Sequence, residues 1–294
     1  MMILFCNYFV FLFYSLFKLC KGDLYTPMTS YEDFLNKEIE KHNPHLKVDD
    51  IKSLKNYVEN DTELKQVKDK ELIIFLHSAS FIVDDAYKTI KYNYEYRSLK
   101  PVYFTYKDLT SQEMIQVKNI IGLSILRSTT EEWHIYAQLK INDASNFIFD
   151  DVIHYFFMII EYLIKTQGAV NKVIFTFNFL NFSFMHSLKL KSMNLFPMLT
   201  FLKNGLPIRV HRINLLNCNY FINIIMNKFL DKSTIDMITF INDPKEILNE
   251  DTKDIMPSNI GGNGDDFIAL SDKTYDKMVK FQKDYKKKKE KNNI

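Results

Sequence analysis

Residues 173–180 read VIFTFNFL, and this stretch decides the fold class of the 294-residue chain. It is apolar almost throughout, as a strand is when helices cover both faces of its sheet. Alternation places Phe175, Phe177 and Phe179 on one face of the strand. That phenyl face suits either plain packing under a helix or one wall of an apolar cavity.

Helices and strands alternate on both sides of this strand. Apolar residues recur at helical spacing in residues 150–164 and 188–202, with an interruption at Pro197. Strands placed before, between and after such helices are typical of an α/β domain with a mostly parallel sheet. The other expected elements are strands at 133–139, 208–216 and 240–242, a turn at 205–207, and helices at 220–229 and 233–240.

The pattern before this domain is purely helical. Residues 29–104 contain amphipathic stretches, one of them marked by Ile51, Leu54 and Val58. We therefore predict an N-terminal helical bundle at 29–104 and an α/β/α domain at 111–264. Residues 265–294 are expected to form a C-terminal helix and a basic tail, whose run from Lys286 to Lys291 is either solvated or in contact with an anionic membrane.

The first 22 residues, MMILFCNYFVFLFYSLFKLCKG, are an apolar leader. The run has about the length of a signal core and is short for a spanning helix. It lacks a positively charged start and a small-residue cleavage site. A secretion signal, a membrane anchor and a gene-model artefact ahead of a cytosolic protein are all compatible with it.

Composition and motifs exclude several functions. The net charge of +2 gives no global field for nucleic acid, and the 7 glycines cannot form a Walker loop or a dinucleotide fingerprint. Neither Gly-x-Ser-x-Gly nor His-Glu-x-x-His occurs, and His42 and His45 flank a proline in a polar stretch. We expect no enzyme, no metal and no cofactor. The scattered Cys6, Cys20 and Cys218 are expected to be free thiols.

The third strand carries a possible anion site. Arg209 and His211 share a face by alternation, and the Arg fork matches a phosphate group. A solvated strand end would explain the same two residues.

Four segments together resemble the CRAL-TRIO (Sec14-like) lipid-binding family. They are residues 168–175 (GAVNKVIF), 204–217 (NGLPIRVHRINLLN), 229–230 (FL) and 256–262 (MPSNIGG). The chain is most similar to insect members related to alpha-tocopherol transfer protein and cellular retinaldehyde-binding protein. The resemblance runs from Tyr31 to Phe281 and implies that residues 111–264 are a CRAL-TRIO domain.

The sequence departs from the family pattern at several positions. Thr176 and Phe179 stand where Asp and Gly are usual, and Ile260 stands where a tyrosine precedes the two glycines. Asn227 and Lys228 replace a basic-Pro pair. These changes bear on the ligand and on the lid helix more than on the fold.

The resemblance implies a cavity that holds one lipophilic molecule between the sheet and a mobile lid helix. The implied lining residues are all apolar here: Ile153, Phe156, Ile160, Phe175, Leu190, Met198, Phe201, Leu202, Leu206, Ile208 and Ile213. Relatives often have small polar residues at the positions of Phe156 and Ile160, so a ligand with little polar decoration, or a narrower pocket, is expected. A phosphoinositide site is implied at Arg209, His211 and Lys232, although Ser233 and Met237 occupy two other positions that are basic in relatives.

We therefore predict a carrier that binds a tocopherol-, retinoid- or sterol-like lipid and transfers it between membranes, guided by phosphoinositides. It would be a cytoplasmic monomer, peripheral to membranes, or secreted or anchored if residues 1–22 are retained. One alternative is a phosphoinositide-binding adaptor or sensor without transfer. Another is a family member whose cavity is filled by its own Phe156 and Phe179, and an enzyme is the weakest alternative.

Overall fold

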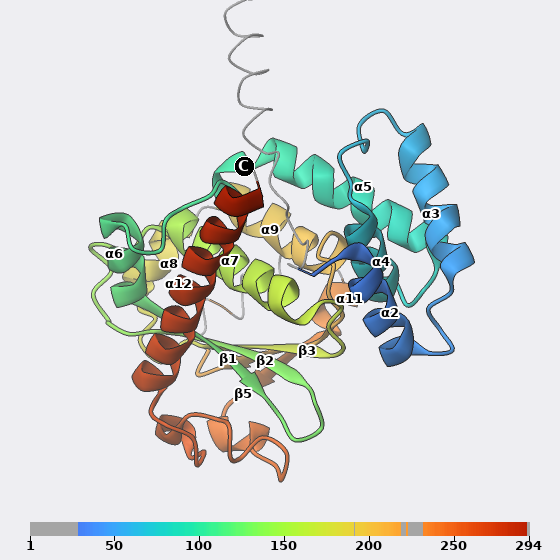
Figure 1. The fold of residues 1–294 in the computed structure, drawn as a ribbon. Coiled ribbons are helices and arrows are strands. Elements are labelled where there is room, and N and C mark those ends of the chain that lie inside the picture. The colour runs from blue at the N-terminus through green and yellow to red at the C-terminus, as the bar shows by residue number, and fades with distance from the viewer. Residues whose placement is uncertain (1–28, 191, 219–221, 223–231, 293–294) are drawn as a thin grey trace, which may run out of the picture.

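The computed structural model describes residues 29–190, 192–218, 222 and 232–292 (Figure 1). The apolar leader, with Cys6 and Cys20, lies outside the described residues, as does nearly all of the helix expected at 220–229. Within the described ranges, no helix is long and apolar enough to cross a membrane.

The N-terminal region is helical, as the sequence predicted. Ser30 begins the first helix by accepting a hydrogen bond from the backbone N–H of Asp33 at 3.1 Å. The buried face of the next helix, at residues 48–60, consists of Ile51, Leu54 and Val58. The helices are α2 (Tyr31–His42), α3 (Val48–Asn60), α4 (Asp69–Ser78), α5 (Val83–Leu99) and the short 3-10 helix η1 (Pro101–Tyr103).

A five-stranded sheet follows, in the order β1-β2-β3-β4-β5. Only β1 and β2 are antiparallel, and the other neighbours are parallel, so the prediction of a mostly parallel sheet is confirmed. The strands are β1 (Ile121–Arg127), β2 (Trp133–Leu139), β3 (Val173–Asn178), β4 (Val210–Leu216) and β5 (Ile238–Ile241).

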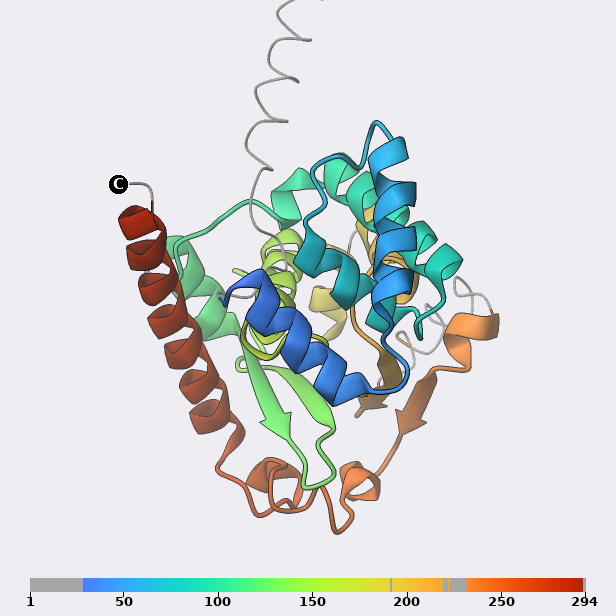
Figure 2. The ribbon, with the colours of Figure 1, turned by 45° about the vertical axis from the view of Figure 1, so that its right-hand side comes forward.

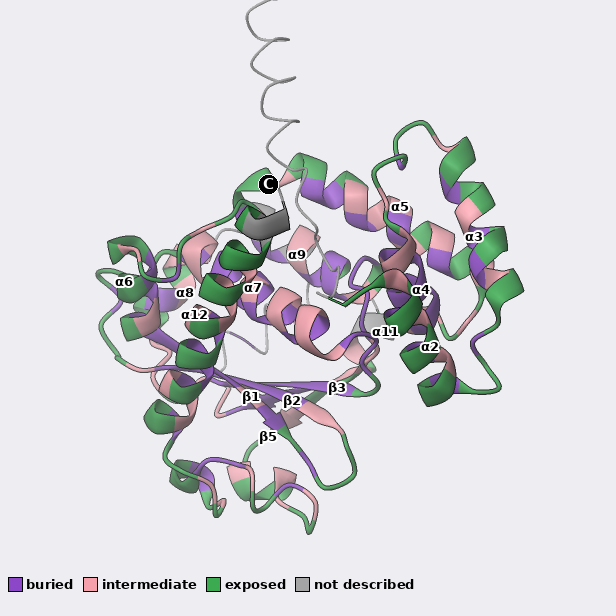
Figure 3. Cartoon of the chain, in the orientation of Figure 1, coloured by how far each residue is buried: buried purple, intermediate pink, exposed green. Residues whose placement is uncertain are grey.

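Two layers cover the sheet (Figures 1 and 2). Helices α7 (Phe149–Gln167), α8 (Phe184–Lys189) and α9 (Ser192–Asn204) lie on the side of the N-terminal helices. Residues 242–266, with the 3-10 helices η2 (Pro244–Ile247) and η3 (Ser258–Ile260), cover the other side together with the start of α12 (Phe267–Asn292). Burial is therefore concentrated in the sheet and in the inner faces of α4 and α7 (Figure 3).

Several predicted elements have different limits. The strand β1 and the preceding helix α6 (Gln112–Ile120) were not predicted from the sequence. The helix expected at 188–202 is two helices, because Leu190 is extended (φ −71°, ψ 110°), and α9 runs through Pro197 without a break. The helix expected at 233–240 is also wrong, since only α11 (Lys232–Ile235) is helical there and β5 follows.

The N-terminal helices are fixed to the sheet domain by buried polar contacts. Arg97 of α5 forms an ion pair with Glu161 of α7 at 3.0 Å, and Asn93 donates to the carbonyl of Gly205 at 2.6 Å. Gly205 has no room for a side chain, because an added Cβ would lie 2.6 Å from the ring of Phe201. The two parts therefore pack as one core, in which Tyr96 stacks on Phe201 at 4.4 Å between ring centroids.

Candidate functional site

Nine of the eleven residues of the predicted lipid site belong to the main hydrophobic core, which also includes the N-terminal helices, and the other two pack against it. The eleven residues come from α7, β3, the end of α8, α9, the turn before β4, and β4 itself. Nine of them are buried, and only Leu190 and Met198 are partly exposed. The geometry is therefore compatible with a shared apolar site, and the assignment of these residues to a ligand stays a prediction.

Aromatic rings occupy the space between α7 and the sheet. Phe156 of α7 lies 5.3 Å from Phe175 and 5.6 Å from Phe177, measured between ring centroids. Phe175 and Phe177 are 6.1 Å apart. These spacings are those of rings in direct contact. The predicted phenyl face thus exists and packs under a helix.

Phe179 lies just beyond the end of the strand and packs against the same core from there. The strand ends at Asn178, one rung before Phe179. The ring of Phe179 lies edge-on to Phe182 at 5.3 Å. Phe156 contacts Phe175, and the partly buried Phe179 packs against the same core, so the filling of a cavity by these two side chains stays a prediction.

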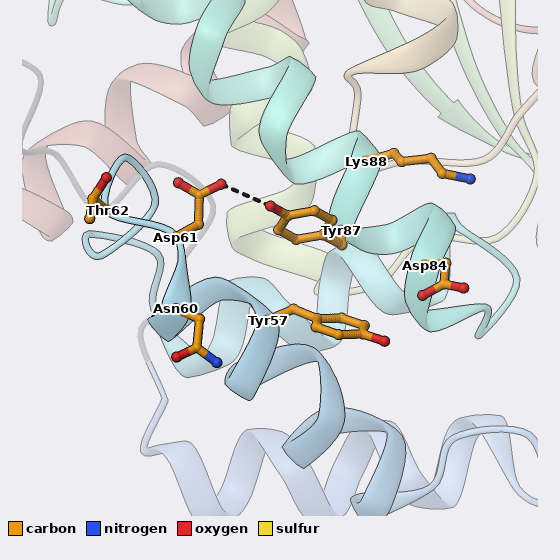
Figure 4. A pocket seen from close by; sticks show the side chains of 7 residues that line it. All are labelled: Tyr57, Asn60, Asp61, Thr62, Asp84, Tyr87 and Lys88. Atoms are coloured by element: carbon orange, nitrogen blue, oxygen red, sulfur yellow. Dashed lines mark hydrogen bonds between the residues drawn. The ribbon is translucent and has the colours of Figure 1, made fainter.

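A first surface pocket lies in the helical region, away from these eleven residues (Figure 4). Tyr57 and Tyr87 line it, with ring centroids 5.7 Å apart. The hydroxyl of Tyr87 donates to Asp61 at 2.8 Å, as the dashed line shows. Asp84 and Lys88 complete a polar rim, so this pocket does not suit a lipid.

A second pocket, the junction cleft, has a volume of about 580 Å³ and lies where α2 meets the sheet domain. Its lining includes five cationic side chains from four separate parts of the chain and two carboxylates. The cationic residues are Lys37, Lys41, Arg127, Lys172 and Arg209.

The three residues of the predicted phosphoinositide site are placed differently from one another. Arg209 is half-buried in the junction cleft, whereas His211 and Lys232 are exposed. The strand pairing passes from Val210 to Arg212 and skips His211. The prediction that Arg209 and His211 share one strand face assumed a strand that starts at residue 208. The strand β4 begins at Val210 instead, and its pairing with β3 shifts register directly after that residue.

Arg209 is held by two contacts with the helical region. Its Nε donates to the carbonyl oxygen of His77 at 2.7 Å. Its guanidinium carbon lies 5.2 Å from the ring centroid of Phe81. Burial lowers the pKa of Arg209 from its usual value, so the charged form is incompletely solvated there.

Titratable groups are also buried behind the cleft. The carboxylate of Glu38 is fully buried and lies 3.1 Å from Nε2 of His42, and the His42 and His77 rings are 4.4 Å apart. Burial, together with nearby Arg209 and His42, lowers the pKa of His77 to about 3, so this ring is neutral. Its Nε2 lies 2.5 Å from Oδ1 of Asn171.

Over the described part of the chain, no group of three or more His, Cys, Asp or Glu side chains could hold a metal ion. Cys218 is a free thiol, and burial raises its pKa to about 12. The thiolate form is therefore strongly disfavoured.

Of the residues that line the junction cleft, only Arg209 was predicted from the sequence to belong to a site. Lys37, Lys41, Arg127 and Lys172 carry no local motif, and they meet only because α2 packs beside the β1–β2 turn and the loop before β3. The one local signal is the spacing of Arg127 and Glu131, which pair at 2.9 Å across that turn.

Two family models match the two parts of the chain. Residues 129–262 match the family model of the CRAL/TRIO domain, and residues 43–114 match that of the Pinta-like UBA domain. No curated protein matches the chain. A crystal structure of Sfh5 is similar, with a TM-score of 0.47 and 13% identity over 83% of this chain and 93% of that one.

The fold is therefore a helical N-terminal region followed by a CRAL/TRIO-type α/β domain. Proteins of the CRAL/TRIO family generally bind or transfer lipids and are typically not enzymes. The domain match covers the strands β2 to β5 and the helices between them.

Proposed function

We propose that this protein is a non-enzymatic carrier of a hydrophobic small molecule. The observation that supports it best is that all eleven predicted lining residues lie within the region that matches the CRAL/TRIO domain and belong to, or pack against, the main hydrophobic core, which also includes the N-terminal helices. The carrier would act as a cytoplasmic monomer that meets membranes transiently.

The ligand would be a tocopherol-, retinoid- or sterol-like lipid. The positions of Phe156 and Ile160 on α7 are apolar and buried, so nothing at these positions offers a hydrogen bond to a polar ligand group. A ligand that hides a few hundred Å² of apolar surface would gain several kcal/mol, at about 25 cal/mol per Å².

Loading would require side chains to move. In the described structure the rings of Phe156, Phe175 and Phe177 are in contact and occupy the space a ligand would need. The proposed sequence of events is opening at a membrane, entry of the lipid, and closure over it. Phosphoinositide contact at Arg209, His211 and Lys232 would favour opening at the right membrane.

The test is native mass spectrometry, with organic extraction, of the whole chain purified from eukaryotic cells. One lipid bound near one-to-one would support the carrier and identify the ligand class. A clean apo mass with no uptake from mixed liposomes would overturn it.

A matched pair of variants locates the ligand. Ile160→Phe adds bulk to α7 inside the proposed site, whereas Ile260→Phe adds the same bulk on the other side of the sheet. Both isoleucines are buried. We expect lipid occupancy to fall several-fold in the first variant and to be unchanged in the second, with circular dichroism confirming that both fold.

The second candidate is an adaptor or sensor that binds a phosphoinositide without transfer. Two observations favour it: the closed aromatic packing around Phe156, and an open cationic cleft that contains Arg209. A lipid-free protein whose vesicle binding is lost in Arg209→Ala would support this candidate over the carrier.

A further inference from the structure

Three large apolar side chains are exposed close together where the N-terminal helices end. Leu99, the last residue of α5, is 76% exposed. Val102 in η1 is 53% exposed, and Tyr106 in the following loop is 69% exposed. Exposed apolar side chains that gather in one short segment commonly mark a surface that meets another body.

The backbone that carries these side chains is held by buried contacts. The side chain of Tyr103 is buried, and its hydroxyl donates to Asp150 of α7 at 2.6 Å. The ring of Phe104 stacks on that of Phe157 in α7, with 4.9 Å between the ring centroids. The exposure of the three apolar side chains is therefore a property of a fixed segment and not of a loose loop.

The end of α12 lies at the same end of the molecule (Figures 1 and 2). Gln282 of α12 donates to the carbonyl oxygen of Lys107 at 2.8 Å and accepts from the backbone N–H of Leu109 at 3.0 Å. One position before it, Phe281 lies edge-on to Tyr162 of α7, at 5.3 Å between ring centroids. The helix is thus fixed beside the loop that follows the apolar side chains.

Lysines dominate the last turns of this helix. Residues 283–291 contain six lysines and only two acidic residues. The side chains of Lys283, Lys286, Lys287 and Lys288 are exposed. Lys283 and Lys287 are four residues apart in the helix, so they share one face. An apolar group and a cationic group are therefore presented at one end of the molecule.

This combination suits the surface of an anionic lipid bilayer. Lysines close to such a surface are attracted by acidic headgroups. Aliphatic side chains gain by entering the boundary between headgroups and acyl chains, and tyrosine prefers the level of the headgroups. A nucleic acid would also attract the lysines, but it would leave Leu99 and Val102 in water. The apolar side chains therefore favour a membrane over a nucleic acid.

We propose that Leu99, Val102, Tyr106 and the lysines of the last turns of α12 form a docking face for an anionic membrane. The inference rests on the membrane contact in the proposed function and names the surface that makes this contact. It uses none of the residues of the predicted phosphoinositide site. Docking through this face requires no ligand in the apolar core.

The first test removes charge from the docking face in the full chain. Sedimentation measures binding to phosphatidylcholine vesicles with and without phosphatidylserine, and without any phosphoinositide. The double substitution Lys286→Gln and Lys287→Gln should weaken binding to the anionic vesicles about tenfold or more. The matched control replaces the exposed Lys253 and Lys273, in the 242–266 segment and at the start of α12, by Gln. It should change binding less than twofold.

The second test removes one apolar side chain. Leu99→Ser should weaken vesicle binding about three- to fivefold, because its contact with the acyl boundary is lost. Ile82→Ser is the control, since Ile82 is 53% exposed at the other end of α5. The two positions are separated by the length of the helix, roughly 25 Å. Circular dichroism checks that every variant folds.

Loss of binding in both test variants, with both controls unchanged, would support the docking face. Equal losses in the controls, or equal binding to vesicles without phosphatidylserine, would overturn it. Unchanged binding in both test variants would also overturn it and place the contact elsewhere in the chain. So would binding of a single-stranded oligonucleotide without binding of vesicles.

Native mass spectrometry of the same proteins keeps this inference separate from the carrier. A test variant that retains its lipid but no longer sediments with vesicles has lost the docking face alone, which supports the inference. A wild-type chain without lipid that sediments normally, and loses this in the test variants, contradicts the carrier and supports the docking face.

Discussion

His134 is a polar side chain on β2 that is buried without hydrogen bonds to the described residues. It is 2% exposed, and neither ring nitrogen has a hydrogen-bond partner among the described residues. Burial lowers its pKa, so the ring is neutral and its two polar atoms are unsatisfied. An apolar residue of similar size would avoid that desolvation cost.

His134→Leu should therefore stabilise the fold, by about 1 kcal/mol. The contrast is Tyr136→Phe, two residues further along the same strand face. The Tyr136 hydroxyl accepts from Asn178 at 2.7 Å and donates to Gln138 at 3.1 Å, so its loss should destabilise by about 1–2 kcal/mol. Urea unfolding measures both, and a destabilised His134→Leu would show that this histidine has a partner, such as ordered water.

Gly168 is the residue at which α7 ends, and its conformation is one that few other residues adopt. Its φ is +77° and its ψ is −140°. A Cβ there would lie 2.3 Å from Oε1 of the buried Glu38. The end of α7 and the position of α2 are thus set by the same residue.

Gly168→Ala should destabilise by about 2–4 kcal/mol, from backbone strain and from the collision with Glu38. Gly261→Ala is the control, because its φ is +94° but an added Cβ would meet nothing closer than 3.4 Å. The free energy of unfolding of Gly261→Ala should fall by about 1–2 kcal/mol from backbone strain alone. If chemical denaturation gave the same loss of stability for both variants, the Glu38 side chain would be able to move away from the added methyl group at no cost.

The elements that the sequence predicted well are those with a strong local pattern. The apolar run at 173–180 and the helical spacing of Ile51, Leu54 and Val58 were sufficient to place β3 and α3, although β3 ends two residues earlier than predicted, at Asn178. The strand β1 was missed because Gly122 and Ser124 interrupt its apolar run. Gly122 is required by packing from far along the chain, since the ring of Phe267 in α12 would lie 2.4 Å from an added Cβ.

The candidate sites show the same limit. Alternation identified the face that carries Phe175, yet it could not tell whether the space above that face is open or filled by Phe156. The junction cleft was not predictable, because Lys37 and Arg209 are brought together only by the packing of α2 on the sheet domain. Charged side chains that lie far apart in the sequence produce no periodic pattern from which their contact could be predicted.

The whole molecule should be sensitive to mild acid, because several histidines are buried in the neutral state. Burial is the main cause that lowers the pKa of His77 to about 3 and of His154 to about 4, and the pKa values of His134 and His186 are lowered as well. In the unfolded chain these rings take up a proton near pH 6.5.

Between pH 6.5 and about 4, the unfolded state therefore binds more protons than the folded state, and stability falls as the pH falls. Above pH 6.5 both states are neutral at these rings, and the contribution is constant. Each fully buried ring costs up to about 1.4 kcal/mol per pH unit in this window. The free energy of unfolding, measured by urea titration at pH 7.5, 6, 5 and 4.5, should fall by several kcal/mol. His154→Leu should reduce the slope by about one ring's share, and an unchanged slope in that variant, or a flat profile in the wild type, would show that these histidines are protonated in the folded protein.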